Sequence, residues 1–302
     1  MPETASVRPP AAIAVVGLGN MGRPMAASLT RAGYQATGYD LAPAARERFA
    51  QAGGRAAADV ASAVAHAAAV ITLLPDGKAV RAAVTAMQPH LSSGTIVIDM
   101  SSSDPIGTRT LGADLKAAGF PFIDAPVSGG VKRASDATLA IMVGGDPAII
   151  DRVEPLLAAM GEVIFRTGPL GSGHAMKALN NYVSAAGLAA ACEALAVGEK
   201  FGLDPNVMTD VLNASSGRNN TTENKLKQFM ISKTFASGFS AALMAKDVRT
   251  ADELGAAIGV ATPLAEICAE LWGEAAARLG PAADHTEYAR YMAERWSVAR
   301  HR

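Results

Sequence analysis

The feature that most constrains this sequence is a long proline-free run, which follows the glycine-rich segment GPLGSGHAMKALNN at Gly168 and continues to about Gly202. The run is dense in Ala, Leu, Met and Glu, which lose little conformational freedom on entering a helix. A helix of this length would span roughly 45 Å at 1.5 Å per residue, longer than one small domain is wide. The sequence therefore predicts two domains joined by one long helix.

Polar side chains near the start of this helix form a candidate site. Lys177 and Asn181 are four residues apart and share one helix face, with Asn180 beside them. An ammonium and a carboxamide would project together toward whatever the glycine-rich turn faces. A solvated surface lysine is the alternative, since most helical lysines are exposed.

Length and net charge limit the class of protein. A chain of 302 residues, half of them apolar, can bury a large core and has the length of two domains. A net charge of −1 leaves no basic excess for nucleic acid or an anionic membrane, so we expect a small-molecule partner. Neither a signal peptide nor a membrane span is recognisable, which favours a cytoplasmic protein.

Metal and thiol chemistry are not expected. The five histidines are scattered without metal-ligand spacing, and no Gly-x-Ser-x-Gly elbow occurs. Cys192 and Cys268 both fall in apolar helical patterns. They are predicted to be buried small hydrophobic residues in a reducing compartment, with no disulfide between them.

A glycine-rich turn near the N-terminus indicates dinucleotide binding. The run AAIAVVG predicts a buried strand, which leads into G-x-G-x-x-G and then a helix that stops at Gly33. The three glycines allow a tight turn, close approach of a pyrophosphate and close helix packing, with the helix N-terminus facing the negative charge. The order strand, turn, helix and second strand supports the motif. The predicted cofactor-binding residues of this turn are Gly17, Gly19, Asn20, Met21 and Gly22.

The acidic residue after the second strand bears on cofactor choice. That strand, QATGYD, ends at Asp40, where a carboxylate would accept hydrogen bonds from the adenosine ribose hydroxyls. The next residues are Leu41 and Ala42 instead of arginine, so NAD is favoured and NADP is less expected. The alternative is an exposed aspartate that starts a turn.

Strands and helices alternate from here to about Thr167. This order predicts an α/β domain of the Rossmann type, a doubly wound parallel sheet with helices on both faces. Ligands bind at the carboxyl ends of such strands, so the corners Leu74-Pro75 and Ser101-Ser102 should line the nicotinamide side. Both corners could equally be ordinary turns.

The run DAPVSGG, which begins at Asp124, is a candidate carboxylate cradle. The hydroxyl of Ser128 precedes Gly129 and Gly130, whose bare backbone N–H groups can approach an anion closely. A flexible Ser-Gly-Gly loop is the alternative, and the residues alone do not choose between the two.

Beyond the long helix the sequence predicts only helices. They are expected at 206–213, 219–230, 240–258, 263–279 and 287–299. The expected organisation is a disordered N-terminal tail over 1–10, a dinucleotide-binding Rossmann domain over 11–171, and an all-α domain over 172–302 that begins with the linking helix.

Two further cations are candidates in the helical domain. Lys246 lies in the helix predicted from Ser240, where an exposed lysine is the alternative. Arg218, within SSGRNNTTE, could bind a second anionic group of a substrate through paired hydrogen bonds. In the alternative, this segment simply closes one helix and caps the next.

Four motifs in this order resemble those of the β-hydroxyacid dehydrogenases, the family of 3-hydroxyisobutyrate dehydrogenase and tartronate semialdehyde reductase. They are GLGNMGRPM at 17–25, DAPVSGG at 124–130, GPLGSGHAMKALNN at 168–181 and KDVRTADE at 246–253. The first is shared by many nucleotide-binding proteins, whereas the second and third are specific. The likeness extends from about Ala11 to the end, with KDV where the family often has KDL.

The resemblance implies an NAD(P)-dependent oxidoreductase that acts on a small 3-hydroxy acid or the matching semialdehyde. It implies that Lys177 is the catalytic acid/base and that Ser128, Gly129 and Asn181 contact the substrate. It further implies that Ser102 contacts the cofactor, that Lys246 lies at cofactor and substrate, and that the helical domain forms a homodimer or homotetramer. Serine stands at position 102 where some members have threonine.

Two alternatives belong to other classes. An imine reductase of related fold is expected to have Asp or Tyr in place of Lys177. A non-catalytic dinucleotide-binding protein would keep the glycine-rich turn and lose the lysines, yet both Lys177 and Lys246 are present.

Overall fold

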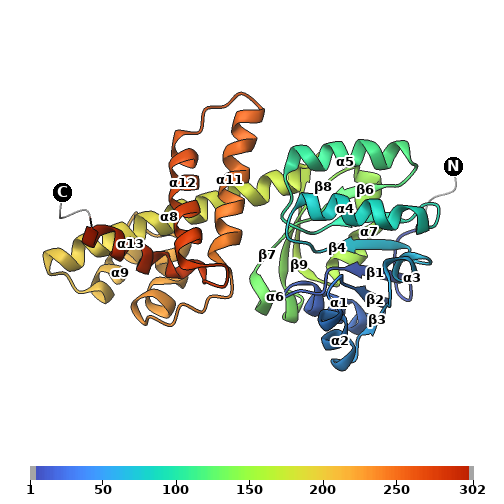
Figure 1. Ribbon diagram of the computed structural model, residues 1–302, viewed down its shortest axis with the longest axis horizontal. Helices are drawn as coiled ribbons and strands as arrows, with labels where there is room; N and C mark the ends of the chain where they lie inside the picture. Colours follow the sequence, from blue (N-terminus) through green and yellow to red (C-terminus); the bar gives the residue numbers. More distant parts are fainter. Residues whose placement is uncertain (1–4, 299–302) are drawn as a thin grey trace. The chain divides into compact units, whose positions relative to one another are not determined.

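The computed structural model describes residues 5–298, and the chain divides into two compact units, Met1–Lys177 and Ala178–Arg302. The division falls inside α8, which runs unbroken from Ser172 to Phe201 (Figure 1). The predicted long helix is confirmed. The first compact unit includes the first turns of α8, beyond the predicted domain boundary at residue 171.

A parallel sheet forms the frame of the first unit, as predicted. Its parallel strands have the order β3-β2-β1-β4-β5-β6, and Val16 of β1 pairs with Tyr39 on one side and Thr72 on the other. The strand order reverses at β1, the position where such sheets bind ligands outside the carboxyl ends of their strands. The strands are β1 (Ala12–Val16), β2 (Gln35–Tyr39), β3 (Arg55–Ala56), β4 (Ala69–Thr72), β5 (Ile96–Asp99) and β6 (Phe122–Asp124).

The far edge of the sheet differs from the wholly parallel arrangement that the alternation predicts. β8 (Leu139–Gly144) pairs antiparallel with β6 and with β7 (Val127–Ser128), while β9 (Gly161–Gly168) is parallel to β8. Between β7 and β8 the chain has only α6 (Gly130–Asp136), which is too short for the crossover that a parallel neighbour requires. α7 (Pro147–Ala158) then supplies such a crossover between β8 and β9.

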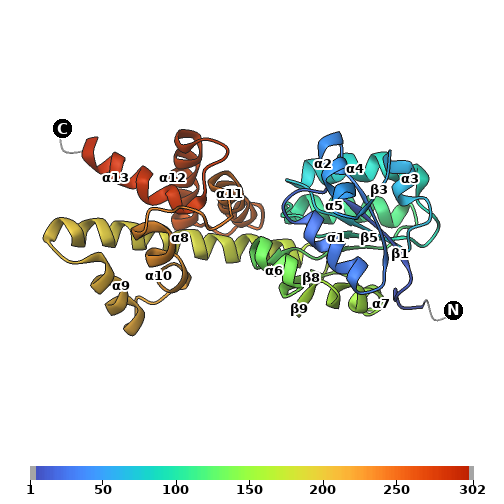
Figure 2. The same ribbon diagram turned by 90° about the horizontal axis from the view of Figure 1, so that it is seen from below.

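Helices cover both faces of the sheet (Figures 1 and 2). α1, α2, α6 and α7 pack with one cluster of buried side chains, and α3, α4 and α5 with another. Ile13 and Val15 of β1 belong to the first cluster and Ala14 and Val16 to the second, as a strand buried on both faces requires. The helices between the strands are α1 (Gly22–Arg31), α2 (Pro43–Gln51), α3 (Val60–Val64), α4 (Gly77–Met87) and α5 (Pro105–Ala117).

The segment before β1 packs on the first unit, which corrects the predicted disordered tail over residues 1–10. Val7 is buried, its N–H donates to the carbonyl of Arg152 on α7, and its carbonyl accepts from the Tyr34 hydroxyl. The correction covers residues 5–10, since residues 1–4 lie outside the described part. One valine in a polar, proline-rich segment has no periodicity that would indicate packing.

The described part of the second unit is all helical, as predicted. Its core centres on Trp272, whose ring stacks on Tyr288 at 4.4 Å and whose Nε1–H donates to the carbonyl of Ala185 on α8. Cys192 and Cys268 are buried in this core as free thiols, which confirms the prediction for them. The helices are α9 (Pro205–Ala214), α10 (Asn220–Asn224), η2 (Leu226–Ile231), α11 (Ala241–Ala257), α12 (Pro263–Leu279), η3 (His285–Glu287) and α13 (Tyr288–Val298).

The helix predicted over 219–230 is divided at Lys225. Up to that residue the segment forms α10, and beyond it η2 is a single stretch of π-helix. The carbonyl of Lys225 accepts from the N–H groups of both Phe229 and Met230, so the hydrogen-bond ladder widens by one residue there. The spacing of apolar residues in the sequence cannot reveal this one-residue widening, because the apolar face of the helix continues across it.

Two searches were negative over residues 5–298. None of the helices there has the length and apolar character needed to cross a membrane. The same residues contain no group of three or more His, Cys, Asp or Glu side chains placed to hold a metal ion.

Candidate active site

The turn after β1 has the geometry of a dinucleotide-binding turn. Gly17 has φ +104°, and a Cβ there would lie 2.2 Å from the carbonyl oxygen of Leu73. A Cβ on Gly22 would lie 1.8 Å from the carbonyl oxygen of Gly17. By contrast, no atom lies within 4 Å of where a Cβ on Gly19 would be, and the neighbouring Asn20 is exposed. The fold itself therefore requires Gly17 and Gly22, while Gly19 leaves room for a ligand.

α1 lacks the capping side chain with which several other helices of this unit begin. Asp76, Asp104 and Asp146 cap α4, α5 and α7 with carboxylates that accept backbone N–H groups. The N-cap of α1 is Met21, whose side chain makes no capping bond, and its first turn has no acidic residue. Beside the open space at Gly19, this helix N-terminus suits a pyrophosphate.

Asp40 lies at the end of β2, where the sequence predicts it, and it is half-buried. Its carboxylate accepts hydrogen bonds from the N–H groups of Leu18 at 2.8 Å and Ala42 at 2.9 Å. No pattern in the sequence identified Arg46, yet its guanidinium reaches back from α2, donates to the carbonyl of Asp40 at 2.6 Å and lies over the Tyr39 ring. Although Leu41 and Ala42 follow Asp40 in the sequence, an arginine thus lies near it in the structure, where backbone carbonyls hold it.

The corners after β4 and β5 are joined by a hydrogen bond, while their place on the nicotinamide side stays a prediction. The N–H of Leu74 donates to the hydroxyl of Ser101 at 2.9 Å, so Ser101 fixes the turn that contains Pro75. Ser101 is buried, whereas Ser102 is half-buried. These corners lie at the sheet edge to which parallel strands direct ligands, and of the two hydroxyls Ser102 is nearer the surface.

The loop from Ser128 to Gly130 bends sharply before α6. Gly129 has φ +136° and Gly130 has φ +69°, conformations that favour glycine. A Cβ on Gly129 would lie 2.6 Å from the side chain of Arg133, whereas one on Gly130 would meet no atom within 4 Å. Both glycines are exposed and Ser128 is half-buried. Successive N–H groups in turns can form a concavity for anions, and a carboxylate cradle at this loop stays a prediction.

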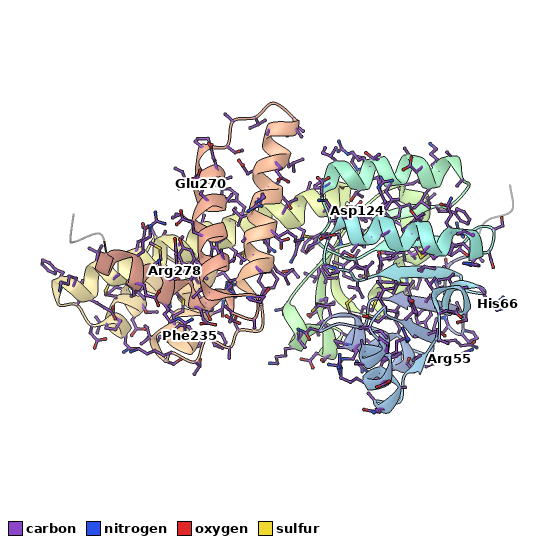
Figure 3. The ribbon with its side chains drawn as sticks, in the orientation of Figure 1. Arg55, His66, Asp124, Phe235, Glu270 and Arg278 are labelled. Carbon is purple, nitrogen blue, oxygen red and sulfur yellow. The ribbon has the colours of Figure 1, made fainter. Side chains whose placement is uncertain are left out.

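A buried polar cluster joins the carboxyl ends of β5 and β6 to the first turn of α8. The carboxylate of Asp124, labelled in Figure 3, accepts from the N–H groups of Gly171 at 2.7 Å and His174 at 2.8 Å. The His174 ring nitrogens lie 3.6 Å from Asp99 and 3.7 Å from Asp124. Burial raises the pKa of Asp124, and the neighbouring His174 opposes that shift. Asp99 and Asp124 are the last residues of β5 and β6. Their place at strand ends is the one feature of the sequence that could have indicated this cluster.

Lys177 and Asn181 lie one turn apart on α8, and both are buried, with exposed fractions of 9% and 7%. Burial excludes the solvated-lysine alternative for Lys177. Within the helical unit, the Asn181 amide donates to the carboxylate of Asp247 on α11, which also pairs with the Lys246 ammonium at 2.9 Å. Asn180 donates to the Asn181 amide oxygen at 3.1 Å. Asp247, unassigned in the sequence although adjacent to Lys246, thus positions two predicted site residues.

Arg218 lies on the surface of the helical unit. Its side chain is 64% exposed and lies 3.6 Å from the carboxylate of Glu223. Asn219 caps α10, and its side chain and that of Thr222 form a reciprocal capping box. The capping alternative for this segment is confirmed. A substrate contact at Arg218 gains no support from the described contacts and stays a prediction.

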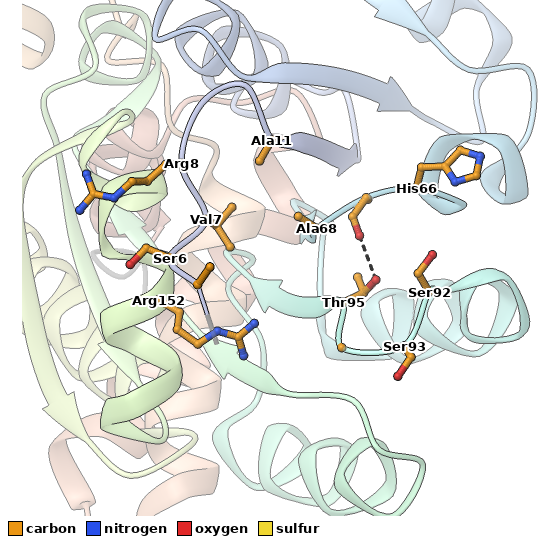
Figure 4. A pocket seen from close by; sticks show the side chains of 13 residues that line it. Ser6, Val7, Arg8, Ala11, His66, Ala68, Ser92, Ser93, Thr95 and Arg152 are labelled. Atoms are coloured by element: carbon orange, nitrogen blue, oxygen red, sulfur yellow. Dashed lines mark hydrogen bonds between the residues drawn. The ribbon is translucent and has the colours of Figure 1, made fainter. Parts of the chain in front are cut away.

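A separate cavity of about 400 Å³ lies at the amino ends of the strands (Figure 4). Its lining includes Ala11, Ala68 and Thr95, which immediately precede β1, β4 and β5, together with Arg152 of α7. Doubly wound sheets bind ligands at the carboxyl ends of their strands, whereas this cavity is at the amino ends. It is therefore not the predicted dinucleotide site.

Two family models match the chain in tandem. Residues 12–168 match the NAD binding domain of 6-phosphogluconate dehydrogenase. Residues 171–292 match a model described as NAD-binding of NADP-dependent 3-hydroxyisobutyrate dehydrogenase. The two matches divide the chain at the start of α8.

Curated relatives and solved structures agree with the models. An NAD-dependent L-serine dehydrogenase of Pseudomonas aeruginosa is 35% identical over 269 residues, covering 86% of this chain and 90% of the relative. The structure of Mycobacterium tuberculosis 3-hydroxyisobutyrate dehydrogenase with L-serine matches with a TM-score of 0.87 and 36% identity, covering 93% of this chain and 99% of the other. An imine reductase from Myxococcus stipitatus matches with a TM-score of 0.64 at 16% identity, covering 93% and 99%, and shows the fold alone.

Proposed function

The chain belongs to the β-hydroxyacid dehydrogenase family and is an NAD(P)-dependent hydroxyacid oxidoreductase; from this premise we propose that its substrate is a small 3-hydroxy acid or the matching semialdehyde, with Lys177 as general acid/base. The observation that carries the proposal is a buried lysine at the start of α8, one turn before Asn181. The first turn of that helix is hydrogen-bonded to Asp124 at the end of β6. An amine is thereby fixed near the sheet edge that binds ligands.

The residues of the first unit fit a nicotinamide dinucleotide. The open space at Gly19 and the N-terminus of α1 would bind the pyrophosphate, and Asp40 would accept from the adenosine ribose hydroxyls. Leu74, Pro75 and the Ser102 hydroxyl would line the nicotinamide side. The bound cofactor supplies the hydride acceptor or donor, a chemistry that no side chain offers.

The remaining residues would handle the substrate. The N–H groups of Gly129 and Gly130, with the Ser128 hydroxyl, would hold its carboxylate and thereby orient the carbon to be oxidised. In oxidation neutral Lys177 Nζ takes the hydroxyl proton as the hydride leaves that carbon, and the alcohol becomes an aldehyde. In reduction the Lys177 ammonium returns the proton to the new hydroxyl. Asn181 would orient the lysine or the hydroxyl.

An NAD(P)H-linked screen of small 3-hydroxy acids and their semialdehydes tests this function. The screen compares 3-hydroxyisobutyrate, L-serine and 3-hydroxypropionate with matched 2-hydroxy acids. We expect turnover only of acids whose hydroxyl is on the third carbon. Turnover of cyclic imines without turnover of any 3-hydroxy acid would replace the proposal with the imine reductase alternative. Cofactor binding with no turnover would favour a non-catalytic dinucleotide-binding protein.

We propose that NAD is preferred over NADP, because the Asp40 carboxylate would repel a 2′-phosphate. Asp40→Asn keeps an acceptor for the Leu18 N–H and removes only the charge. It should shift the ratio of kcat/KM toward NADP by about tenfold, the effect of removing about 1.4 kcal/mol of repulsion. Arg46→Gln in that background should reverse part of the shift, since the guanidinium is then the nearest cation to the phosphate. Steady-state kinetics with both cofactors measures this, and a wild-type preference for NADP contradicts it.

We also propose a homodimer or homotetramer formed through the helical unit. Apolar side chains recur at one-turn spacing near the end of α8, at Val197 and Phe201, and on α9, at Val207 and Val211. Each is more than half exposed in the single chain. Exposed apolar side chains at this spacing are typical of helices that form subunit interfaces. Sedimentation equilibrium should give an oligomer for the wild type and a smaller species for Phe201→Asp.

A further inference from the structure

His174 occupies an unusual position between two buried carboxylates. It is 1% exposed, and its Nε2 lies 3.6 Å from Asp99 while its Nδ1 lies 3.7 Å from Asp124. Asp99 and Asp124 are themselves 1% and 0% exposed. A buried charge without a partner is costly, so the protonation of the ring between these groups matters to the whole cluster.

The hydrogen bonds of Thr108 favour a hydrogen on Nδ1. The Thr108 hydroxyl has one hydrogen, and it lies 2.9 Å from the carbonyl of Asp104, to which it donates as a helix residue does. The same hydroxyl lies 2.8 Å from His174 Nδ1, so it accepts there and Nδ1 carries a hydrogen.

The other ring nitrogen, Nε2, faces the carboxylate of Asp99 at 3.6 Å. This carboxylate accepts from the hydroxyls of Thr72 at 2.9 Å and Ser103 at 2.6 Å and from the N–H of Ser101 at 3.0 Å. These three donors satisfy the carboxylate on the sides away from the ring. A bare Nε2 would direct its lone pair at that anion, whereas an Nε2–H would face it favourably. With a hydrogen on each nitrogen, the ring would face both carboxylates through a donor.

We propose that His174 is a positioning residue that acts through Lys177: its imidazolium locks the first turn of α8 to the ends of β5 and β6. This rests on the proposed role of Lys177, which lies three residues further on and thus next to His174 on the helix surface. Asp99 leads into the Ser102 corner and Asp124 into the Ser128 loop. The His174 ring thereby keeps Lys177 in a fixed position relative to the predicted cofactor and substrate contacts.

Removing the ring charge has a predictable effect on this register. His174→Gln would leave Asp99 and Asp124 facing each other without a cation between them, and the first turn of α8 would shift to separate them. Arg109 on α5 is exposed and donates to the carbonyl of Leu170. Misplacement of a catalytic group by about 1 Å typically costs on the order of 100-fold in rate.

The experiment compares kcat, KM, NADH affinity and pH profiles of three variants with wild type. His174→Gln should lower kcat by about 10- to 100-fold with NADH affinity within about threefold. Its kcat/KM for alcohol oxidation should rise at a higher pH than in wild type, because loss of a neighbouring cation favours the Lys177 ammonium. Asp99→Asn added to His174→Gln should recover part of the lost kcat, since it removes the charge mismatch.

His285→Gln is the matched control. His285 is equally buried, and its Nδ1 contacts the Ser237 hydroxyl at 2.9 Å and lies 3.5 Å from Asp284, all within the helical unit. The His285→Gln enzyme should have a lower free energy of unfolding, with the kcat and the pH profile of kcat/KM unchanged from wild type. If His285→Gln and His174→Gln lose kcat equally, or if the His174→Gln profile is unmoved, His174 has only a structural role and the proposal is overturned.

A spectroscopic arm does not depend on turnover. The ¹⁵N shifts of the His174 ring, assigned by their absence in His174→Gln, should report two protonated nitrogens at neutral pH. A neutral ring would overturn the inference even if the enzyme turns over hydroxy acids. If the ring is an imidazolium but the protein oxidises no hydroxy acid, the proposed function is wrong. The charge assigned to His174 is then still correct.

Discussion

Lys177→Ala should lower kcat for the best 3-hydroxy acid by about 10²- to 10⁴-fold, the usual contribution of general acid/base catalysis. NADH affinity should remain nearly intact, because the predicted dinucleotide contacts lie in the turn after β1 and at Asp40. The loss arises because an alkoxide is too unstable to form freely at neutral pH, so the hydroxyl proton needs an acceptor as the hydride leaves. Steady-state kinetics and NADH fluorescence titration measure the two quantities.

Lys225→Ala is the control for this experiment. Burial lowers the pKa of Lys225 to about 8, a shift that the Asp284 carboxylate opposes, and its ammonium lies 3.4 Å from the Ser184 hydroxyl. Lys225 is thus a second partly buried lysine, in the helical unit and without an assigned role. Its removal should leave kcat within a few-fold of wild type. Small alkylamines should restore part of the activity of Lys177→Ala but not change that of Lys225→Ala. A Lys177→Ala enzyme with kcat within a few-fold of wild type removes Lys177 from the mechanism.

The fold could be predicted largely because its signals are local. An apolar run closed by glycine marks β1, and aspartates such as Asp76 and Asp104 stand at helix starts as capping residues. The length of α8 follows from the absence of proline. The antiparallel direction of β8 was not predictable in this way, since it depends on how far the short α6 can carry the chain.

Site residues could be predicted where the local structure requires one residue type or where a specific motif contains the residue. Gly17 and Gly22 are required by the turn itself, and Lys177 was identified by its place in a specific motif. The supporting residues were not, because they come from separate segments. His174 meets Asp99 only across 75 positions of sequence, and Arg46 reaches Asp40 only because α2 turns it back. The substrate contact predicted at Arg218, whose side chain lies on the surface beside Glu223, stays a prediction.

A pair of glycine variants should separate the fold of the dinucleotide turn from its ligand binding. Gly22→Ala would place a Cβ 1.8 Å from the Gly17 carbonyl oxygen, a contact that only a backbone shift can relieve. Overpacking of this kind costs about 1–3 kcal/mol or more, so both the free energy of unfolding and NADH affinity should fall. Of the substitutions considered for the first unit, this one should disturb the turn most.

Gly19→Ala should have the opposite pattern. No atom of the protein lies within 4 Å of its Cβ position, so thermal unfolding of the free enzyme should be unchanged. The added methyl group would instead occupy the space left for the pyrophosphate, and NADH affinity should fall by on the order of tenfold or more, about 1.4 kcal/mol. Gly187→Ala on α8, where a Cβ makes an ordinary 3.6 Å contact with Asn219, is the control and should keep wild-type affinity. Calorimetry and NADH titration of the three variants decide the matter: a Gly19→Ala enzyme that binds NADH as tightly as wild type would place the pyrophosphate elsewhere than at this turn.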